Sequence, residues 1–304
     1  MGNNNSSLKH KNKKIETNKE IDNKTTELEE KKELKYYIPN NYDDIDRVHM
    51  FHFLQRYIFQ SNFSSPIEER LMQEKCKVLD VGCGPGTWLL DLANKYEKCV
   101  FYGLDNNPIF PNEIKPGNLN FIKAGMFDGL PFPDNEFDFV HQGFVLFVVK
   151  ADQWNFIISE MIRVTKPGGY IELLEPFSSF RGFGPIVRKI HEAHLASCSE
   201  RGVDMKVLPN LDKIIKSNQQ TPIVYKEERF FISGPNGGKV GTAHEDIYVG
   251  YHDNDAAMEN LSPILGISKE KYKIMITKDL VEELKHTSPE FSLLRFWAKK
   301  INNN

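Results

Sequence analysis

The sequence predicts an α/β fold: a doubly wound, mostly parallel sheet of seven strands with a helical cap. Two observations lead to this prediction. Short apolar runs typical of buried strands alternate with segments of helical periodicity between residues 77 and 175. A glycine-rich turn joins the first of these strands to the helix that follows it, and open parallel sheets bind ligands at such turns.

Seven segments have the composition of strands, because each is a short apolar or alternating run bounded by turn residues. They are residues 78–81, 100–105, 119–123, 137–142, 170–175, 223–232 and 291–298. Helical spacing of apolar residues predicts helices at 45–58, 87–93, 151–165, 185–201, 211–217 and 278–286. The segment Lys166–Gly169, KPGG, is predicted to be a turn.

The segment Lys77–Ala93, KVLDVGCGPGTWLLDLA, organises the chain. Gly82, Gly84 and Gly86 allow a tight turn and a close approach of the backbone to a ligand. A dinucleotide fingerprint would need its third glycine at residue 87, where Thr87 stands. The spacing G-x-G-x-G, with an acid in the preceding strand, therefore disfavours a nicotinamide oxidoreductase.

Asp105 ends the second predicted strand about 20 residues beyond the glycines. A carboxylate there can accept hydrogen bonds from both hydroxyl groups of a ribose. The alternative is an ordinary acid at the turn after a strand. We expect Asp105 to be the strongest single contact to a nucleoside-containing ligand.

Composition excludes several classes of function. The 304 residues carry a formal net charge of −3, so no overall field favours nucleic acid. No apolar run approaches the length of a membrane span, and the polar amino terminus lacks a secretory signal. The four cysteines have no C-x-x-C spacing, which indicates a reducing compartment. His49 and His52 alone are too few ligands for a metal, and no metal is expected.

Residues 1–35 are rich in Asn, Lys and Glu and are expected to form a disordered tail. Residues 36–300 are expected to form one domain, with a core at about 74–176 and cap elements at about 36–73 and 240–265. Val240–Leu265 mixes aromatic and acidic residues, and the two cap segments are predicted to cover the ligand site.

The tail begins MGNNNS, which fits the N-myristoylation pattern with Gly2 and Ser6. A basic segment, Lys9–Lys14, follows it. A fatty chain with a basic patch would give peripheral membrane contact. The alternative is a solvated tail on a cytoplasmic or nuclear protein, and the sequence leaves both open.

The segment DVGCGPGT resembles the first motif of the class I S-adenosylmethionine-dependent methyltransferases. PFPDNEFDFVHQ, RVTKPGGYIELLEP, NFSSPIEERL and the terminal LLRFWAKK are similar to segments of fungal methyltransferases of the LaeA type. This resemblance covers about residues 36–300 and implies a Rossmann-like methyltransferase fold. It also implies S-adenosyl-L-methionine as cofactor, S-adenosyl-L-homocysteine as product, and a methyl acceptor of unknown class, a small molecule or a protein.

Carried onto this chain, the resemblance assigns cofactor contacts to the glycine turn and to the ends of the first four strands. These residues are Asp80, Gly82, Cys83, Gly84, Gly86, Thr87, Asp105, Asn106, Met126, Phe127, His141 and Gln142. Cys83 is interpreted as a small packing residue of the turn. Met126 and Phe127 are expected to flank the adenine, and His141 and Gln142 to face the methionine half.

Two departures from the family pattern motivate an alternative function. Gly125 and Met126 stand where relatives often carry an acid or amide, and Gly143 stands where many carry arginine. A non-catalytic S-adenosylmethionine-binding regulatory module is therefore the competing hypothesis. No catalytic residue is assigned. The polar candidates are His141, Glu175, His244 and Tyr248, and His191 and His194 are predicted to lie on the polar face of their helix.

Overall fold

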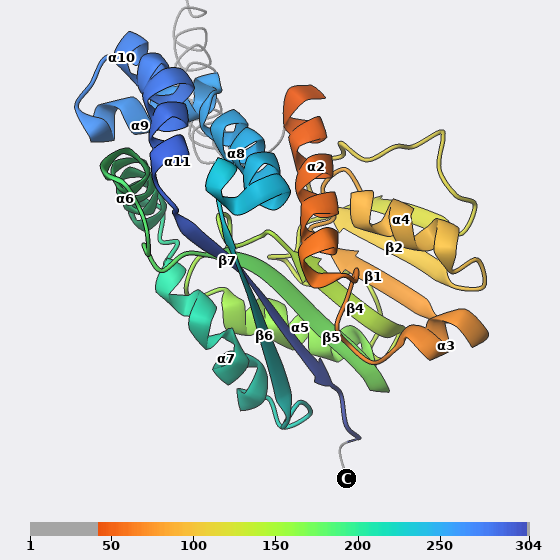
Figure 1. Ribbon diagram of the computed structural model, residues 1–304. Coiled ribbons are helices and arrows are strands. Elements are labelled where there is room, and N and C mark those ends of the chain that lie inside the picture. The colour runs from red at the N-terminus through yellow and green to blue at the C-terminus, as the bar shows by residue number, and fades with distance from the viewer. Residues whose placement is uncertain (1–41, 303–304) are drawn as a thin grey trace, which may run out of the picture. The chain divides into compact units, whose positions relative to one another are not determined.

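The structure, a computed structural model, describes residues 42–302 (Figure 1), which belong to one unit spanning Pro39–Asn304. The predictions for the tail, for Gly2 and for Lys9–Lys14 fall outside the described residues. Within residues 42–302, no helix combines the length and the apolar character that crossing a membrane requires.

The helices and strands follow one another in chain order as α2 Tyr42–Phe59, α3 Glu68–Gln73, β1 Lys77–Val81, α4 Thr87–Lys95, β2 Val100–Asp105, β3 Leu119–Lys123, β4 Phe137–Gly143, α5 Trp154–Val164, β5 Thr165–Phe177, α6 Pro185–Glu200, η1 Met205–Asn210, α7 Leu211–Ser217, β6 Val224–Ile232, η2 Pro235–Gly237, α8 Gly238–His252, α9 Asp255–Leu265, α10 Lys269–Ile274, η3 Met275–Leu280, α11 Val281–His286 and β7 Glu290–Lys299. Here η1 and η2 are 3₁₀ helices, and η3 is a π-helical turn between α10 and α11.

The seven strands form one sheet in the order β3-β2-β1-β4-β5-β7-β6. The pairs from β3 to β5 are parallel, and β7 runs antiparallel to both β5 and β6. The strand order reverses between β1 and β4, so the carboxyl ends of these two strands form the switch point at which such sheets bind ligands. The predicted fold class is confirmed.

Both faces of the central strands β1 and β4 are buried, because alternate residues of each strand pack against different helices. Leu79 and Val140 belong to the core beneath α5 and α7, together with Ile157 and Leu211. Their neighbours Val78 and Phe139 face the opposite core, which includes residues of α3 and α4. This double burial explains why the strands read as nearly continuous apolar runs.

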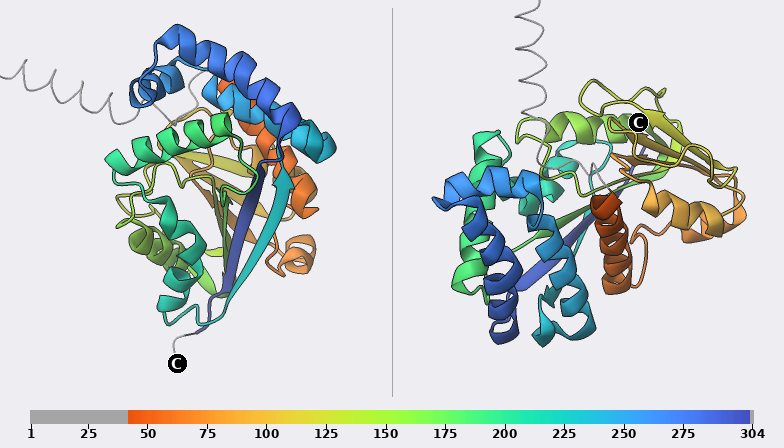
Figure 2. Two further views of the ribbon diagram at one scale, coloured as in Figure 1. Left: turned by 60° about the vertical axis from the view of Figure 1, so that its left-hand side comes forward. Right: turned by 90° about the horizontal axis from the view of Figure 1, so that it is seen from above.

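The cap consists of α2 and of the helices α8–α11, which connect the end of β6 to the start of β7 (Figure 1). Because β7 is antiparallel, this insertion lies at the carboxyl edge of the parallel strands. α2 packs against both α8 and α4, and it lies between them in Figure 1 and in the right-hand view of Figure 2. Of the first predicted cap segment, α2 lies beside α8 of the second, whereas α3 packs in the core on one face of the sheet.

One prediction about the fifth strand is wrong at its start. β5 begins at Thr165, and the KPGG segment bulges within the strand instead of preceding it. Thr165 pairs with Phe137, and Tyr170 pairs with Phe139, so the register shifts across the bulge. Gly168 has φ +81°, a conformation that favours glycine and that gave this segment the signature of a turn.

A buried ion pair joins the end of α2 to the sheet. The carboxylate of Glu172 on β5 accepts hydrogen bonds from the backbone N–H of Ser64 at 2.9 Å and of Ser65 at 2.8 Å. Arg295 on β7 lies 3.2 Å from the same carboxylate, and its guanidinium covers the ring of Phe59 at 3.8 Å. Both charged side chains are almost completely buried, which requires this degree of pairing.

Replacing Arg295 should destabilise the fold strongly, because it leaves the Glu172 carboxylate buried without its counter-charge. We expect Arg295→Met to lower the free energy of unfolding by about 3–5 kcal/mol in urea titrations. The double variant Glu172→Gln, Arg295→Met should lose less than Arg295→Met alone. Arg181→Met, at an exposed ion pair with Glu290, should cost about 1 kcal/mol or less. Equal losses for the two arginine variants would contradict this assignment.

Candidate active site

The glycine turn is pinned to the neighbouring strand by two backbone hydrogen bonds. The N–H groups of Gly82 and Cys83 both donate to the carbonyl of Leu104, at 2.8 and 3.1 Å. Gly84 has φ +54°, and a Cβ placed there would meet no atom within 4 Å. A Cβ on Gly82, by contrast, would lie 2.9 Å from the side chain of Val145. Gly84 is thus the glycine whose missing side chain leaves room for a ligand.

Asp105 lies directly beside this turn, at the end of β2. One carboxylate oxygen accepts the N–H of Gly84 at 2.8 Å, and the other accepts the N–H of Asn107 at 2.8 Å. A carboxylate has about four acceptor positions, so these bonds leave room for a further donor. Burial raises the pKa of Asp105, and hydrogen bonds from the backbone N–H groups of Asn107, Gly84 and Asn106 act in the opposite direction. Asn106, between Asp105 and Asn107, is exposed.

Asp80 and His141 occupy paired positions on β1 and β4. His141 Nδ1 lies 2.8 Å from Asp80 Oδ1, and both side chains are buried. An ionised carboxylate only accepts, so this contact places a proton on Nδ1. The indole of Trp88 stacks on the imidazole with a centroid distance of 4.0 Å. Nε2 of His141 is buried and has no hydrogen-bond partner among residues 42–302.

Gln142 points to the opposite side of the sheet from His141 and lies beside Met126, so the two side chains do not share one surrounding, although both were expected to face the methionine half. Its side-chain N–H donates to the sulfur of Met126 at 3.4 Å, while its Oε1 is buried without a hydrogen-bond partner in the described part of the chain. Met126 is buried, and Phe127 beside it is partly exposed. Met126 and Phe127, the two predicted neighbours of the adenine, therefore differ in burial. The buried Oε1 of Gln142 belongs to the amide that contacts Met126.

Thr87 begins α4 and connects it to the cap. Its hydroxyl lies 2.6 Å from Nδ1 of His49 on α2. Asp91, one turn later on α4, accepts hydrogen bonds from Arg56 and Asn62, and its pKa is lowered to about 2 chiefly by a hydrogen bond with His52. The sequence offered no signal for these partners, because they lie 29 to 39 positions away.

Cys83 is buried within the turn, and burial raises the pKa of its thiol. Its sulfur lies 2.9 Å from the position that a Cβ on Gly103 would occupy. The side chain fills the space between the turn and β2.

The polar candidates for catalysis differ in their hydrogen-bond partners and in the direction of their pKa shifts. Glu175 is completely buried at the carboxyl end of β5, where its carboxyl accepts the N–H groups of Val145 and Leu146 at 3.2 and 3.3 Å. Burial raises the pKa of Glu175 to about 8. Because Val145 packs against Gly82, Glu175 supports the loop that borders the glycine turn.

His244 and Tyr248 lie one turn apart on α8, inside the cap. His244 Nδ1 is 2.8 Å from the hydroxyl of Ser233, and burial lowers the pKa of His244 to about 3. The hydroxyl of Tyr248 is buried and has no hydrogen-bond partner within the described residues. The prediction for His194 is wrong, since it is buried and its ring lies 4.8 Å from that of Phe147.

Comparison with known proteins identifies the family. A family model described as a methyltransferase domain matches residues 78–169. The N-methyltransferase verN of Clonostachys rogersoniana is 29% identical over 154 residues, which are 49% of this chain and 53% of that protein. The demethylmenaquinone methyltransferase of Anoxybacillus flavithermus is 30% identical over 172 residues, which are 50% of this chain and 72% of that protein. The chain belongs to the class I methyltransferases.

The methyltransferase likeness covers only part of each protein. The chain spans 53% of the length of verN and 33% of the methyltransferase str3 of Strobilurus tenacellus. The matched family model covers the glycine turn, Asp105 and β4, and ends within the KPGG segment. Among residues 42–302 no group of three or more His, Cys, Asp or Glu side chains could hold a metal ion. The likeness to LaeA-type proteins stays a prediction.

The raised pKa of Glu175 makes folding stability depend on pH. The folded protein holds a proton on Glu175 up to about pH 8, whereas the unfolded chain releases it near the ordinary value of 4.5. Stability should therefore fall as pH rises from about 5 to 8. Glu175→Gln keeps an oxygen for the backbone N–H groups and removes the ionisation, so this part of the pH dependence should disappear.

Urea unfolding at several pH values between 5 and 9 measures this effect. Glu97→Gln, at an exposed position, is the matched control and should unfold like the parent at every pH. Identical pH profiles for the parent and Glu175→Gln would show that Glu175 does not hold the extra proton.

Proposed function

We propose that this chain binds S-adenosylmethionine against the glycine turn and transfers its methyl group to a nucleophilic acceptor. The observation that carries the proposal is the position of Asp105, fixed by the Gly84 and Asn107 N–H groups at the edge where β1 and β2 end. A carboxylate held in this way can still accept hydrogen bonds from the hydroxyl groups of a ribose.

The residues around the turn fit this cofactor in three respects. Gly84 leaves room for a ligand where a side chain would project. Nε2 of His141 is a buried acceptor when Nδ1 holds the proton, and an α-ammonium group is a donor of the matching kind. Oε1 of Gln142 is a second buried acceptor, suited to an amine donor such as that of adenine. Buried polar atoms without partners are rare, and ligands commonly supply the missing partner.

The cofactor, when bound, supplies a methyl group that is already electrophilic because it is attached to a sulfonium. With the cofactor held by the glycine turn and Asp105, this carbon would pass from sulfur to the acceptor, and any acceptor proton would pass to solvent. The protein's contribution is then to hold the acceptor in line and to exclude water, which accounts for up to about 7–11 kcal/mol in favourable cases. α2 and α8 cover the edge at which this alignment would occur.

The proposal covers any nucleophilic acceptor, whether a small molecule or a protein. The relatives' names indicate different chemistries, since verN and tcpN are named as N-methyltransferases and others as demethylmenaquinone methyltransferases. Incubation of the full chain and a cell lysate with methyl-labelled S-adenosylmethionine tests for transfer directly, with protein, lipid and small-molecule fractions counted separately. Binding of S-adenosylhomocysteine without labelling of any fraction would favour the non-catalytic binding module.

Replacing Asp105 should weaken cofactor binding while the fold is retained. Asp105→Ala loses charge-assisted hydrogen bonds to the ribose, which corresponds to roughly 1.5–3 kcal/mol, or about 10- to 150-fold in affinity. Calorimetric titration with S-adenosylhomocysteine measures the change. Asp152→Ala, at an exposed site outside the turn, should bind like the parent. Parent-like affinity in Asp105→Ala would remove the site assignment.

Cofactor affinity should also depend on pH through Asp105. The ribose hydroxyl groups favour the ionised carboxylate, so affinity should rise with pH until Asp105 is fully ionised and then level off. Because burial raises the pKa of Asp105, the weakening on acidification should begin at a higher pH than for an exposed aspartate. In Asp105→Asn, the same titration series should lose this dependence. A dependence that persists in the variant would assign it to another group.

A further inference from the structure

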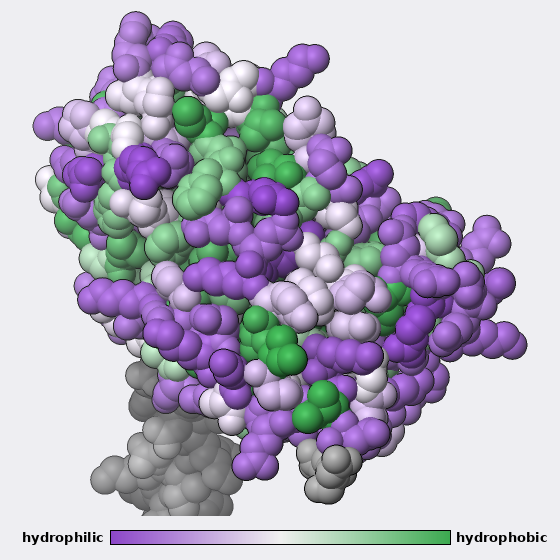
Figure 3. Space-filling model, turned by 60° about the horizontal axis from the view of Figure 1, so that its bottom comes forward, coloured by the Kyte–Doolittle hydropathy of each residue, from purple (hydrophilic) through white to green (hydrophobic). Residues whose placement is uncertain are grey.

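β6 is the last strand of the sheet and has an unoccupied edge. It pairs with β7 on one side, and no strand within residues 42–302 pairs with its other side. Tyr225 and Phe230 are about half exposed, and Ile223, just before the strand, is 63% exposed. On the face drawn in Figure 3, apolar side chains lie in green among hydrophilic ones in purple. A long exposed edge with apolar side chains is a template for pairing with another strand.

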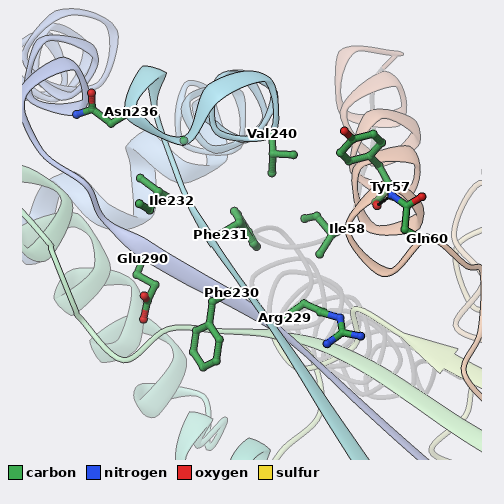
Figure 4. Close-up of a pocket in the computed structure, with 11 residues that line it drawn as sticks. Tyr57, Ile58, Gln60, Arg229, Phe230, Phe231, Ile232, Asn236, Val240 and Glu290 are labelled. Carbon is green, nitrogen blue, oxygen red and sulfur yellow. Dashed lines mark hydrogen bonds between the residues drawn. The ribbon is translucent and has the colours of Figure 1, made fainter.

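A groove with both apolar and polar walls lies beside the carboxyl-terminal half of this strand. It has a volume of about 590 Å³, and its walls include Ile58 of α2, Phe231 of β6 and Val240 of α8. In Figure 4, these three side chains are directed toward the space between β6, α2 and α8. Tyr57 and Phe230 at its margin are 62% and 55% exposed. The groove is large enough for an aromatic side chain.

The sequence of β6 is complementary to itself when reversed. Tyr225, Glu227, Arg229 and Phe231 share one face of the strand, because side chains alternate. Glu227 and Arg229 stand one position on either side of Glu228, and Tyr225 and Phe231 stand three positions on either side. The ion pair between Glu227 and Arg229 within the chain confirms that their side chains lie on the same face.

We propose that β6 pairs antiparallel with β6 of a second copy of this chain, about a two-fold axis at Glu228. In this register Glu227 of each copy lies opposite Arg229 of the other. Tyr225 of each copy lies opposite Phe231 of the other, at the groove. Each contact occurs twice, as a closed two-fold interface requires.

One contact on the axis opposes the pairing. The two Glu228 side chains would face each other, and like charges directly opposite are destabilising. Glu228 accepts a hydrogen bond from the hydroxyl of Ser292 on β7 at 2.7 Å, which draws its carboxylate toward its own sheet. The competing explanation is that the charged centre of β6 protects the edge against pairing, which is a common use of charges on edge strands.

Light scattering during size exclusion tests the proposal on the full chain over a range of concentrations. The parent should give twice its monomer mass of 35.1 kDa at high concentration and dissociate on dilution. Glu227→Arg and Arg229→Glu should each elute as monomers, because each places like charges opposite one another. Glu228→Gln should remain dimeric at lower concentrations than the parent.

Variants that exchange the charges at residues 227 and 229 test whether the two copies of β6 pair in this register. An equimolar mixture of Glu227→Arg and Arg229→Glu should form a heterodimer, since every opposed pair is again of opposite charge. The double variant Glu227→Arg, Arg229→Glu should dimerise with itself. Val240→Trp should reduce dimerisation by filling the groove while leaving every charge on β6 in place.

Glu259→Arg, at an exposed ion pair on α9, should leave the dimer unchanged. Unfolding midpoints in urea show whether each variant remains folded. A parent that is monomeric at its highest soluble concentration would overturn the proposal. Single-charge variants that remain dimeric, or a mixture that remains monomeric, would overturn it as well.

Discussion

The buried carboxylate of Glu172 is the contact on which the arrangement of the cap over the sheet depends. It binds the backbone after α2 through Ser64 and Ser65, and it pairs with Arg295 from the last strand. Arg295 in turn covers Phe59, the final residue of α2. A charge that is costly to bury is satisfied only when β5, β7 and the chain after α2 are all in place.

This anchor has consequences at the carboxyl edge of the sheet. With its end held, α2 reaches α4 through His49 and Thr87 and through the group around Asp91. The same edge carries the glycine turn, Asp105 and the loop supported by Glu175. The Asp105 carboxylate is held by the N–H groups of Gly84 and Asn107, so it is already oriented before any ligand arrives.

Local patterns predicted most of the fold. β2 and β3 occur at the predicted residues, because each is a short run rich in apolar residues that is bounded by turn residues. The glycine turn was predictable because its conformation depends on residues that are adjacent in sequence. The start of β5 was not, since a bulge containing Gly168 carries the same local signature as a turn.

The pairing of distant groups could not be predicted from the sequence. Asp80 and His141 meet only because β1 and β4 are neighbours, although β2 and β3 intervene in the chain. Glu172 and Ser64 are 108 positions apart, and Arg295 and Ser64 are 231 positions apart. His194 looked like a surface residue because its helix is amphipathic, and its burial depends on where the rest of the cap packs.

The central claim is that the glycine turn and Asp105 form the cofactor site of a methyltransferase. A crystal structure of the full chain with S-adenosylhomocysteine tests this claim most directly. We expect both ribose hydroxyl oxygens within about 3.2 Å of the Asp105 carboxylate, with the ligand passing over Gly84. A ligand bound elsewhere, or a ribose that makes no contact with Asp105, would contradict it.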